Sequence, residues 1–495
     1  MTIIKNKKLV IVLAFLCSFA VRWFYIMPMN EKSPWYSCLD QDIYINTQSM
    51  AINSGFSPDN LAHPGFAIMY FNAIYLQVTS KLGMENAYKL KHFIQSPEPF
   101  TLWPKIIKSS RSSSFLLSFV YIVFIGLIIS KLTHSWWMFI PGAIISNLFL
   151  GVNTQAIMIR SELLSAISGM LAFYLGLWAI EEKKYHLILS LLSGLLCGFS
   201  VFGKVMGYPF LAFVLFWMIF FNPEALSFSL RSFKDIFPFI KKNVFKKTSL
   251  VFMLGLILSP VVPFLLMIPK TGVTEAKMLV KYVINCIFAI DQDVMSSYSM
   301  MHYNSSGQYE QEANLSNWWI EILNFMQYYA YFLGFMILTW LLYLIFKKKP
   351  WPKIRILACI VFSVSFVVFV AIRRFSDIYI VYTDIFFILA FLWLMFIFIR
   401  DLPKNRQGLV ICLFVLASSV VLIKKGLSFY NEAVAMKLKT ETLLENKPFN
   451  IVVVHSDYYS ATRYKMLMKH HYKTEEDFLK RMGVFLQDIK NHFPR

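Results

Sequence analysis

Residues 37–82 read SCLDQDIYINTQSMAINSGFSPDNLAHPGFAIMYFNAIYLQVTSKL and directly follow the first long apolar run of the chain. The segment is acidic and aromatic, and it places Asp40 and Asp42 within about one helical turn of the predicted membrane surface. An ionisable group at the edge of the hydrocarbon needs a partner, such as a cation, a metal ion or a substrate hydroxyl, to offset its desolvation. We therefore expect the chemistry of the protein to be concentrated in this segment.

The composition around this segment defines the class of the protein. Hydrophobic residues make up 57% of the chain and charged residues only 15%, and the apolar residues come in long runs. Runs long enough to cross about 30 Å of hydrocarbon predict membrane spans. They lie near residues 9–27, 113–132, 136–152, 163–180, 187–203, 205–221, 249–268, 320–346, 356–372, 379–399 and 408–423. The sequence thus predicts an all-α polytopic membrane protein with about eleven transmembrane helices.

The orientation follows from the basic loops. Residues 64–82 are apolar enough to span, but placing them in the membrane interface puts the basic N-terminus and the basic segments 222–248, 347–349 and 400–406 on the cytoplasmic side, as the positive-inside rule favours. The basic segment 81–112 then lies outside, against the rule, and long loops obey it less strictly. It carries Lys81, Lys89, Lys91, Lys105, Lys108 and Arg111. We expect a cytoplasmic N-terminus and an extracytoplasmic C-terminus.

Two domains are predicted from this arrangement. Residues 1–423 form the transmembrane domain, with outer loops at 28–112 and 269–319, and residues 424–495 form a small α/β tail outside the membrane. The net charge of +20 is accounted for by attraction to anionic lipid, and no basic stripe with interleaved aromatic residues indicates nucleic-acid binding. The expected location is a bacterial inner membrane.

Common catalytic signatures are absent from the sequence. It has no HExxH, no CxxC, no glycine-rich phosphate loop and no GxSxG, which disfavours zincin, nucleotide-hydrolysing and serine-hydrolase activities. Gly194 and Gly198 form a small-xxx-small pair, which is typical of a helix-packing seam.

Within residues 37–82, the pattern predicts two helices. The first covers Ile43 to Asn53 and stops at Gly55, with Tyr44 one turn beyond Asp40. The second covers Phe66 to Leu82 and lies in the interface, after a start at His63-Pro64-Gly65. Aspartate is also a favoured helix N-cap, so one of the two carboxylates has a structural alternative, and His63 has the alternative of a cap or surface residue.

These residues carry a resemblance. A long first span, Asp40, Tyr44, Gly55 and a helix that opens HPGFAIMYFNAIYLQ resemble the start of the GT-C superfamily of membrane glycosyltransferases. The branch in question includes the aminoarabinose transferases of lipid A and the rhizobial lipopolysaccharide sugar transferases, and more distantly the protein O-mannosyltransferases. The likeness continues to about residue 210, through Arg160-Ser161-Glu162 at the start of the fourth span and SGLLCGFSVFGKVMG, which contains Lys204.

The sequence departs from the superfamily in two places. The superfamily usually has an acidic residue directly after the aspartate, whereas Gln41 follows Asp40 here and the second carboxylate is Asp42. Two prolines usually begin the juxtamembrane helix, where this chain has Pro64-Gly65. The first departure leaves open which carboxylate acts.

The resemblance implies transfer of a sugar from a polyprenyl-phosphate donor to a lipid, glycan or protein acceptor on the outer face, with inversion. Such a reaction needs a carboxylate base and cations for the leaving phosphate. The expected base is Asp40 or Asp42, and Glu162 would orient the acceptor or share a divalent cation with Asp40. Expected phosphate-binding residues are Lys204, Arg373 and Arg374, and expected substrate-binding residues are Tyr44 and His63.

Three alternatives remain open at the level of sequence. A transporter or a flippase for lipid-linked glycan would also be polytopic, but it predicts ionisable residues inside the spans, whose cores are nearly free of them. A GT-C scaffold that binds lipid-linked glycan without transferring it fits the same residues. Finally, Lys204 and Arg373 have the alternative of extending to lipid head groups, as lysine and arginine near span ends commonly do.

Overall fold

The computed structural model describes residues 7–32, 39–55, 65–83, 88–89, 92, 99–147, 149–182, 184–204, 245–265, 302–303, 309–310 and 380–400, with isolated positions among 207–217, 273–281 and 402–431. These residues are mostly helical, as predicted. The predicted spans at 320–346 and 356–372 and the α/β tail lie outside the described residues, apart from two isolated positions near the start of the tail.

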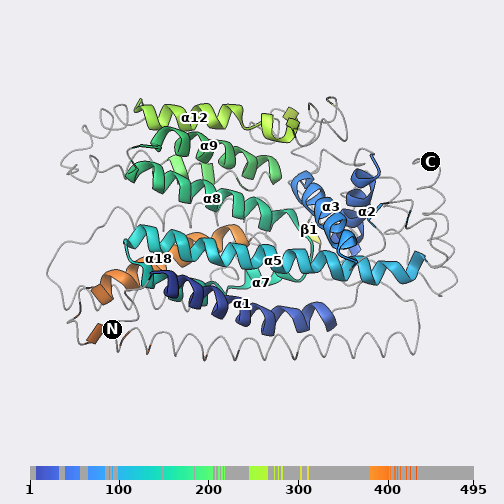
Figure 1. Cartoon of the computed structure of the whole chain (residues 1–495), viewed down its shortest axis with the longest axis horizontal. Helices are drawn as coiled ribbons and strands as arrows, with labels where there is room; N and C mark the ends of the chain where they lie inside the picture. Colours follow the sequence, from blue (N-terminus) through green and yellow to red (C-terminus); the bar gives the residue numbers. More distant parts are fainter. Residues whose placement is uncertain are drawn as a thin grey trace.

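Long helices run side by side and form a bundle (Figure 1). They are α1 (Lys7–Lys32), α5 (Pro99–Thr133), α8 (Ser161–Glu181), α9 (His186–Gly203), α12 (Lys247–Leu258) and α18 (Ile380–Arg400). Among the described helices, three segments are long and apolar enough to cross a membrane: Lys105–Thr133, Ser161–Glu181 and His186–Gly203.

The seam between α9 and α12 depends on glycine. A Cβ atom on Gly194 would lie 2.1 Å from the carbonyl oxygen of Phe252, and one on Gly255 would lie 2.3 Å from the carbonyl oxygen of Leu191. A Cβ atom on Gly198 would collide with the side chain of Ser259. Because backbone atoms stand in the way, only glycine permits this approach, and the seam predicted at Gly194 and Gly198 is confirmed.

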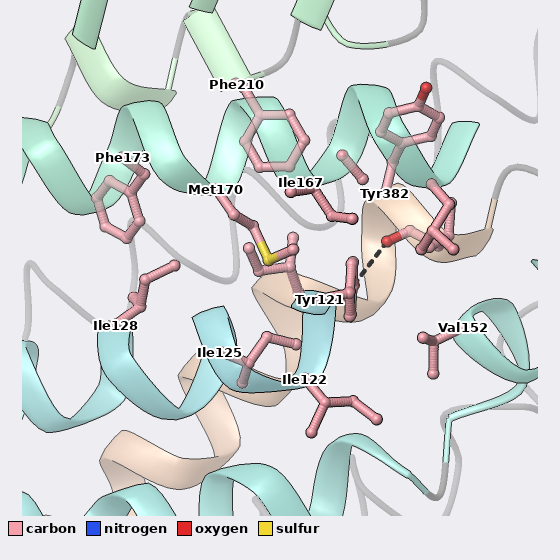
Figure 2. Packing of buried hydrophobic residues seen from close by; sticks show 14 of the residues in the cluster. Tyr121, Ile122, Ile125, Ile128, Val152, Ile167, Met170, Phe173, Phe210 and Tyr382 are labelled. Carbon is pink, nitrogen blue, oxygen red and sulfur yellow. Dashed lines mark hydrogen bonds between the residues drawn. The ribbon is translucent and has the colours of Figure 1, made fainter. Parts of the chain in front are cut away.

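The core of the bundle is formed by α5, α8 and α18 (Figure 2). Tyr121 donates its hydroxyl to the carbonyl oxygen of Val381 at 2.9 Å, which ties α5 to the start of α18. Met170 and Phe173 of α8 pack with Phe210 and the residues around Tyr121. Burying these large side chains holds the helices that carry the site in fixed positions.

Two helices cross the end of the bundle, near the start of α5 (Figure 1). They are α2 (Leu39–Asn53) and α3 (Phe66–Lys81), close to the predicted bounds. A positive φ of 85° at Gly55 follows the last turn of α2, a conformation that glycine adopts without strain. Asn72 of α3 donates to Asn46 Oδ1 and Ser49 Oγ of α2, at 3.0 and 3.1 Å. A buried polar contact thus fixes the register of the two helices.

One predicted span is broken. The sequence predicts a single helix over residues 136–152, and the structure divides the region into a 3-10 turn, η2 (Trp136–Met138), and two short helices, α6 (Phe139–Ser146) and α7 (Leu150–Ala156). The side-chain amide of Asn153 donates to the carbonyl oxygen of Asn147 at 3.0 Å and satisfies a group that the break sets free. Non-helical backbone at membrane depth requires such partners.

The segment predicted to be the first outer loop is also more helical than expected. α5 begins at Pro99, so residues 99–112 of the predicted basic loop form its first turns. In the segment predicted to be the second outer loop, β1 (His302–Tyr303) pairs with β2 (Tyr309–Glu310) in antiparallel register.

Candidate functional site

Asp42 lies in the first turns of α2 and is fully buried. Arg111 of α5 donates to its Oδ2 atom through Nη2 at 2.7 Å and through Nε at 2.9 Å. The backbone N–H of Ile159 donates to its Oδ1 atom at 3.1 Å. Both carboxylate oxygens of Asp42 are therefore engaged by the protein itself.

The electrostatics of Asp42 are those of a buried ion pair. Burial raises the pKa of the Asp42 carboxyl, and the Arg111 guanidinium and the Ile159 N–H act against that rise by stabilising the charged form. Arg111 is 1% exposed, so neither charge has access to bulk water. The pair joins α2 to α5 at the end of the bundle.

Glu162 is the second buried carboxylate and stands in the first turn of α8. Arg160, just before the helix, donates to Glu162 Oε2 at 3.2 Å through Nε and to Oε1 at 3.3 Å through Nη2. Lys204, which follows the last residue of α9, places its Nζ atom 3.3 Å from Glu162 Oε1. One carboxylate thus holds two cationic side chains from different elements.

The two carboxylates and their partners form one polar cluster, because Ile159, Arg160 and Glu162 belong to the same short segment. We refer to Asp42, Arg111, Arg160, Glu162 and Lys204 as the charged cluster. It contains three cationic groups and two carboxylates. Cations held in a water-poor environment attract an anion more strongly than they would in water. The cluster is therefore suited to stabilising negative charge brought by a ligand.

The structure brings three of the predicted site residues together: Asp42, Glu162 and Lys204. Lys204 is 6% exposed and contacts a carboxylate, which does not fit the alternative of a lysine extended to lipid head groups. Asp40 and Tyr44 lie one turn apart in α2, and their side chains are outside the described part of the structure. His63, Arg373 and Arg374 also lie outside the described residues.

Sequence reasoning missed two members of the charged cluster. From sequence, Arg111 is one of several loop charges, and Arg160 is only a neighbour of Glu162. A signal for Arg111 exists in its surroundings, which read SSRSSS at residues 109–114. Ser110, Ser113 and Ser114 are buried with it, so small side chains there leave room for a guanidinium inside the protein.

A divalent cation at Glu162 does not fit this arrangement. Both oxygens of Glu162 face Arg160 or Lys204, and a metal ion would have to displace or approach two positive groups. Among the described residues, no group of three or more His, Cys, Asp or Glu side chains could hold a metal ion.

The chain was compared with known proteins by sequence and by structure. No protein-family model matches it, and no curated protein matches it significantly. The structure is similar to ArnT from Cupriavidus metallidurans, solved bound to undecaprenyl phosphate, with 11% identity and a TM-score of 0.43 over 97% of this chain and 72% of that chain.

A second solved structure is also similar. It is the archaeal oligosaccharyltransferase AglB from Archaeoglobus fulgidus, in complex with an inhibitory peptide and a dolichol-phosphate. The identity is 11% and the TM-score 0.46, over 94% of this chain and 60% of that chain. Both TM-scores are below 0.5, so the function has to be argued from the site itself.

Proposed function

We propose that this chain is a membrane glycosyltransferase that moves a sugar from a polyprenyl-phosphate donor to a hydroxyl group of a lipid, glycan or protein acceptor. The observation that carries the proposal is the charged cluster at the end of the bundle, where Glu162 holds Arg160 and Lys204 beside the helix that bears Asp40. Apolar helices give such a site access to a lipid-bound donor. We place it on the extracytoplasmic face, following the distribution of basic loops.

In this proposal, Asp40 is the general base. Asp42 is 0% exposed, and each of its oxygens already accepts from Arg111 or Ile159. Asp40 is the second residue of α2 and stands about 3 Å from position 42 along the helix axis, nearer the end of the helix. An acceptor hydroxyl there would lose its proton to Asp40, and Tyr44, one turn later, would contact the same substrate.

The reaction is a displacement at the anomeric carbon. The acceptor oxygen forms a bond to that carbon while the bond from the carbon to the phosphate oxygen breaks, and the anomeric configuration inverts. The electron pair leaves with the polyprenyl phosphate. Lys204 and Arg160 stabilise its charge, and Arg373 and Arg374 are further candidates for that role. Glu162 keeps the two described cations in place and offsets part of their charge before the donor binds.

Lys204 provides the experiment. Replacing Lys204 with alanine removes a charge-assisted contact to phosphate, so we expect the donor KM to rise roughly 10- to 100-fold, while Lys204→Arg retains part of the activity. The matched control is Lys131→Ala. Lys131 also pairs with a glutamate at the end of a helix, since its Nζ atom lies 2.5 Å from Glu181 Oε2. This pair is in the last turn of α5, away from the charged cluster. Equal donor use by Lys204→Ala and the parent would exclude the phosphate role.

The substrate is sought by mass spectrometry of surface glycolipids and glycoproteins in cells with and without the gene. We expect one sugar to be missing from an acceptor and its polyprenyl-phosphate form to accumulate. Purified protein should then release free polyprenyl phosphate from that donor when the acceptor is added. Intact donor after incubation with its acceptor would contradict the proposed reaction.

A lipid-linked glycan flippase is the second candidate, and two residues favour it. Arg22 in α1 and Asp384 in α18 are buried, although the sequence predicts span cores nearly free of ionisable groups. Such residues often mark a transport pathway. A flippase would move the lipid-linked sugar between leaflets of a vesicle without releasing polyprenyl phosphate, so the release measurement separates the two functions.

A further inference from the structure

Arg22 is a buried cation outside the charged cluster. It lies in α1, is 0% exposed, and forms no ion pair with any carboxylate in the described part of the chain. Its Nη2 atom donates to the carbonyl oxygen of Val152 at 3.1 Å, and its Nη1 atom donates to Asn153 Oδ1. Both partners belong to α7. Removing a guanidinium from water costs free energy, and no described carboxylate offsets that cost here. Its burial therefore needs a reason other than stability.

The segment that Arg22 holds is a short helix next to a break in the backbone. α7 has seven residues, and a helix of this length is not stable by itself. Its Asn153 binds both Arg22 and the carbonyl oxygen of Asn147 on the other side of the break. One turn after Arg22, Ile26 packs on Ala156 at the end of α7. The same face of α1 therefore contacts the middle and the last residue of this helix.

The segment directly after α7 builds the charged cluster. Ile159 lies three residues after the last residue of α7 and donates its N–H to Asp42, and Arg160 then contacts Glu162. A shift of α7 would move both contacts, because only two residues separate its end from Ile159. The cluster is thus connected to α1 through a short path of hydrogen bonds and a few peptide units.

We propose that Arg22 is a positioning residue: it fixes α7, and through α7 it places the Ile159 N–H on Asp42 and Arg160 beside the phosphate of the donor. The role of Arg22 in placing residues 157–162 stands on its contacts with α7. Its effect on sugar transfer rests on the proposed function.

Amide hydrogen exchange of the full-length protein in lipid nanodiscs tests the placement without any substrate. In Arg22→Met, the amide of Ile159 should exchange roughly tenfold faster or more, since the N–H is no longer held in register with Asp42, while amides in the middle of α9 keep the parent rate. Arg22→Lys, which retains a single donor group, should give a smaller increase. Ser18→Ala is the control, because Ser18 is buried one turn earlier on the same face of α1 and its hydroxyl has no hydrogen-bond partner among the described residues.

A second variant keeps the test decisive if Arg22→Met does not fold. Asn153→Ala keeps the guanidinium and removes one of its two acceptors, so it should also accelerate exchange at Ile159. If Arg22→Met does not fold, unchanged exchange at Ile159 in both Arg22→Lys and Asn153→Ala overturns the proposal. If Arg22→Met folds, parent-like exchange at Ile159 in that variant overturns it.

Transfer activity is measured separately. With the donor found for the parent, Arg22→Met should lower kcat/KM about 100-fold, as misplacing catalytic groups by an ångström can do, and Arg22→Lys should recover part of the loss. If the parent shows no transfer, the proposed function fails, and the exchange data still decide the placement. If the exchange changes but kcat/KM does not, the link from Arg22 to the reaction is wrong.

Discussion

At the scale of single residues, the proposal gives Asp40 and Asp42 different roles although only Gln41 separates them. Asp42 is 0% exposed and bound by Arg111 and Ile159, which makes it part of the framework. Asp40 is the residue to which the proposed mechanism gives the acceptor proton. The two aspartates should therefore respond differently to the same substitution.

We expect Asp42→Asn to destabilise the fold and Asp40→Asn to remove activity. Asparagine at position 42 leaves the buried charge of Arg111 without its carboxylate, a change that typically costs about 3–5 kcal/mol. Asparagine at position 40 removes the base, which lowers the rate about 10²- to 10⁴-fold. Thermal unfolding and initial transfer rates, measured on both variants, separate the effects.

A double variant serves as the control. Asp42→Leu with Arg111→Met replaces the ion pair by apolar side chains and should recover much of the lost stability, because no unpaired charge remains. A stable, inactive Asp42→Asn together with a fully active Asp40→Asn would assign the base to Asp42 instead.

At the scale of elements, the packing of α9 on α12 depends on glycines, which have no side chain. We expect Gly194→Ala to destabilise the protein by about 1–3 kcal/mol, since its new methyl group would meet the backbone of α12. The change in melting temperature of the purified protein measures this.

Gly203→Ala is the matched control on the same helix. Its Cβ atom would lie 3.5 Å from that of Ala67, an ordinary contact. Alanine is a better helix former than glycine by about 1 kcal/mol, so this variant should be as stable as the parent or more stable. Equal changes in melting temperature for the two substitutions would mean that α9 and α12 do not approach as closely as they do in the structure.

At the scale of the whole molecule, the charged cluster lies at the end of the bundle where α8 begins and α9 ends. The loop between α8 and α9 is at the opposite end, about 30 Å away along α8. The proposed orientation places the cluster outside the cell membrane and that loop inside.

Cysteine labelling tests this orientation. In a cysteine-free background, Lys81→Cys at the end of α3 should react with a membrane-impermeant maleimide in intact spheroplasts, and Lys184→Cys should react only after permeabilisation. Both side chains are exposed, so access to reagent and not burial decides the result. The reverse pattern would place the site in the cytoplasm and contradict an extracytoplasmic transferase.

Local patterns were enough to predict much of the molecule. Apolar runs predicted α8 and α9 to within two residues, because hydrocarbon admits only backbone whose hydrogen bonds are satisfied within the segment. The turn at Gly55, the helix α3 and the glycine seam also follow from short-range rules for φ, helix starts and close packing. The cost of an ionisable residue at a span end marks Asp42 as a candidate. Glu162 and Lys204 are candidates because of the resemblance to the GT-C superfamily.

Only the tertiary structure decided which of these residues meet. The Asp42–Arg111 contact joins positions 69 apart in sequence, and the role of Asp42 depends on it. The break between α6 and α7 also depends on a contact between residues distant in sequence. Arg22 of α1 and Asn153 satisfy the polar groups that a continuous helix would have paired internally. Hydropathy records the cost of a polar group in the membrane, whereas its partner is set by how distant helices pack.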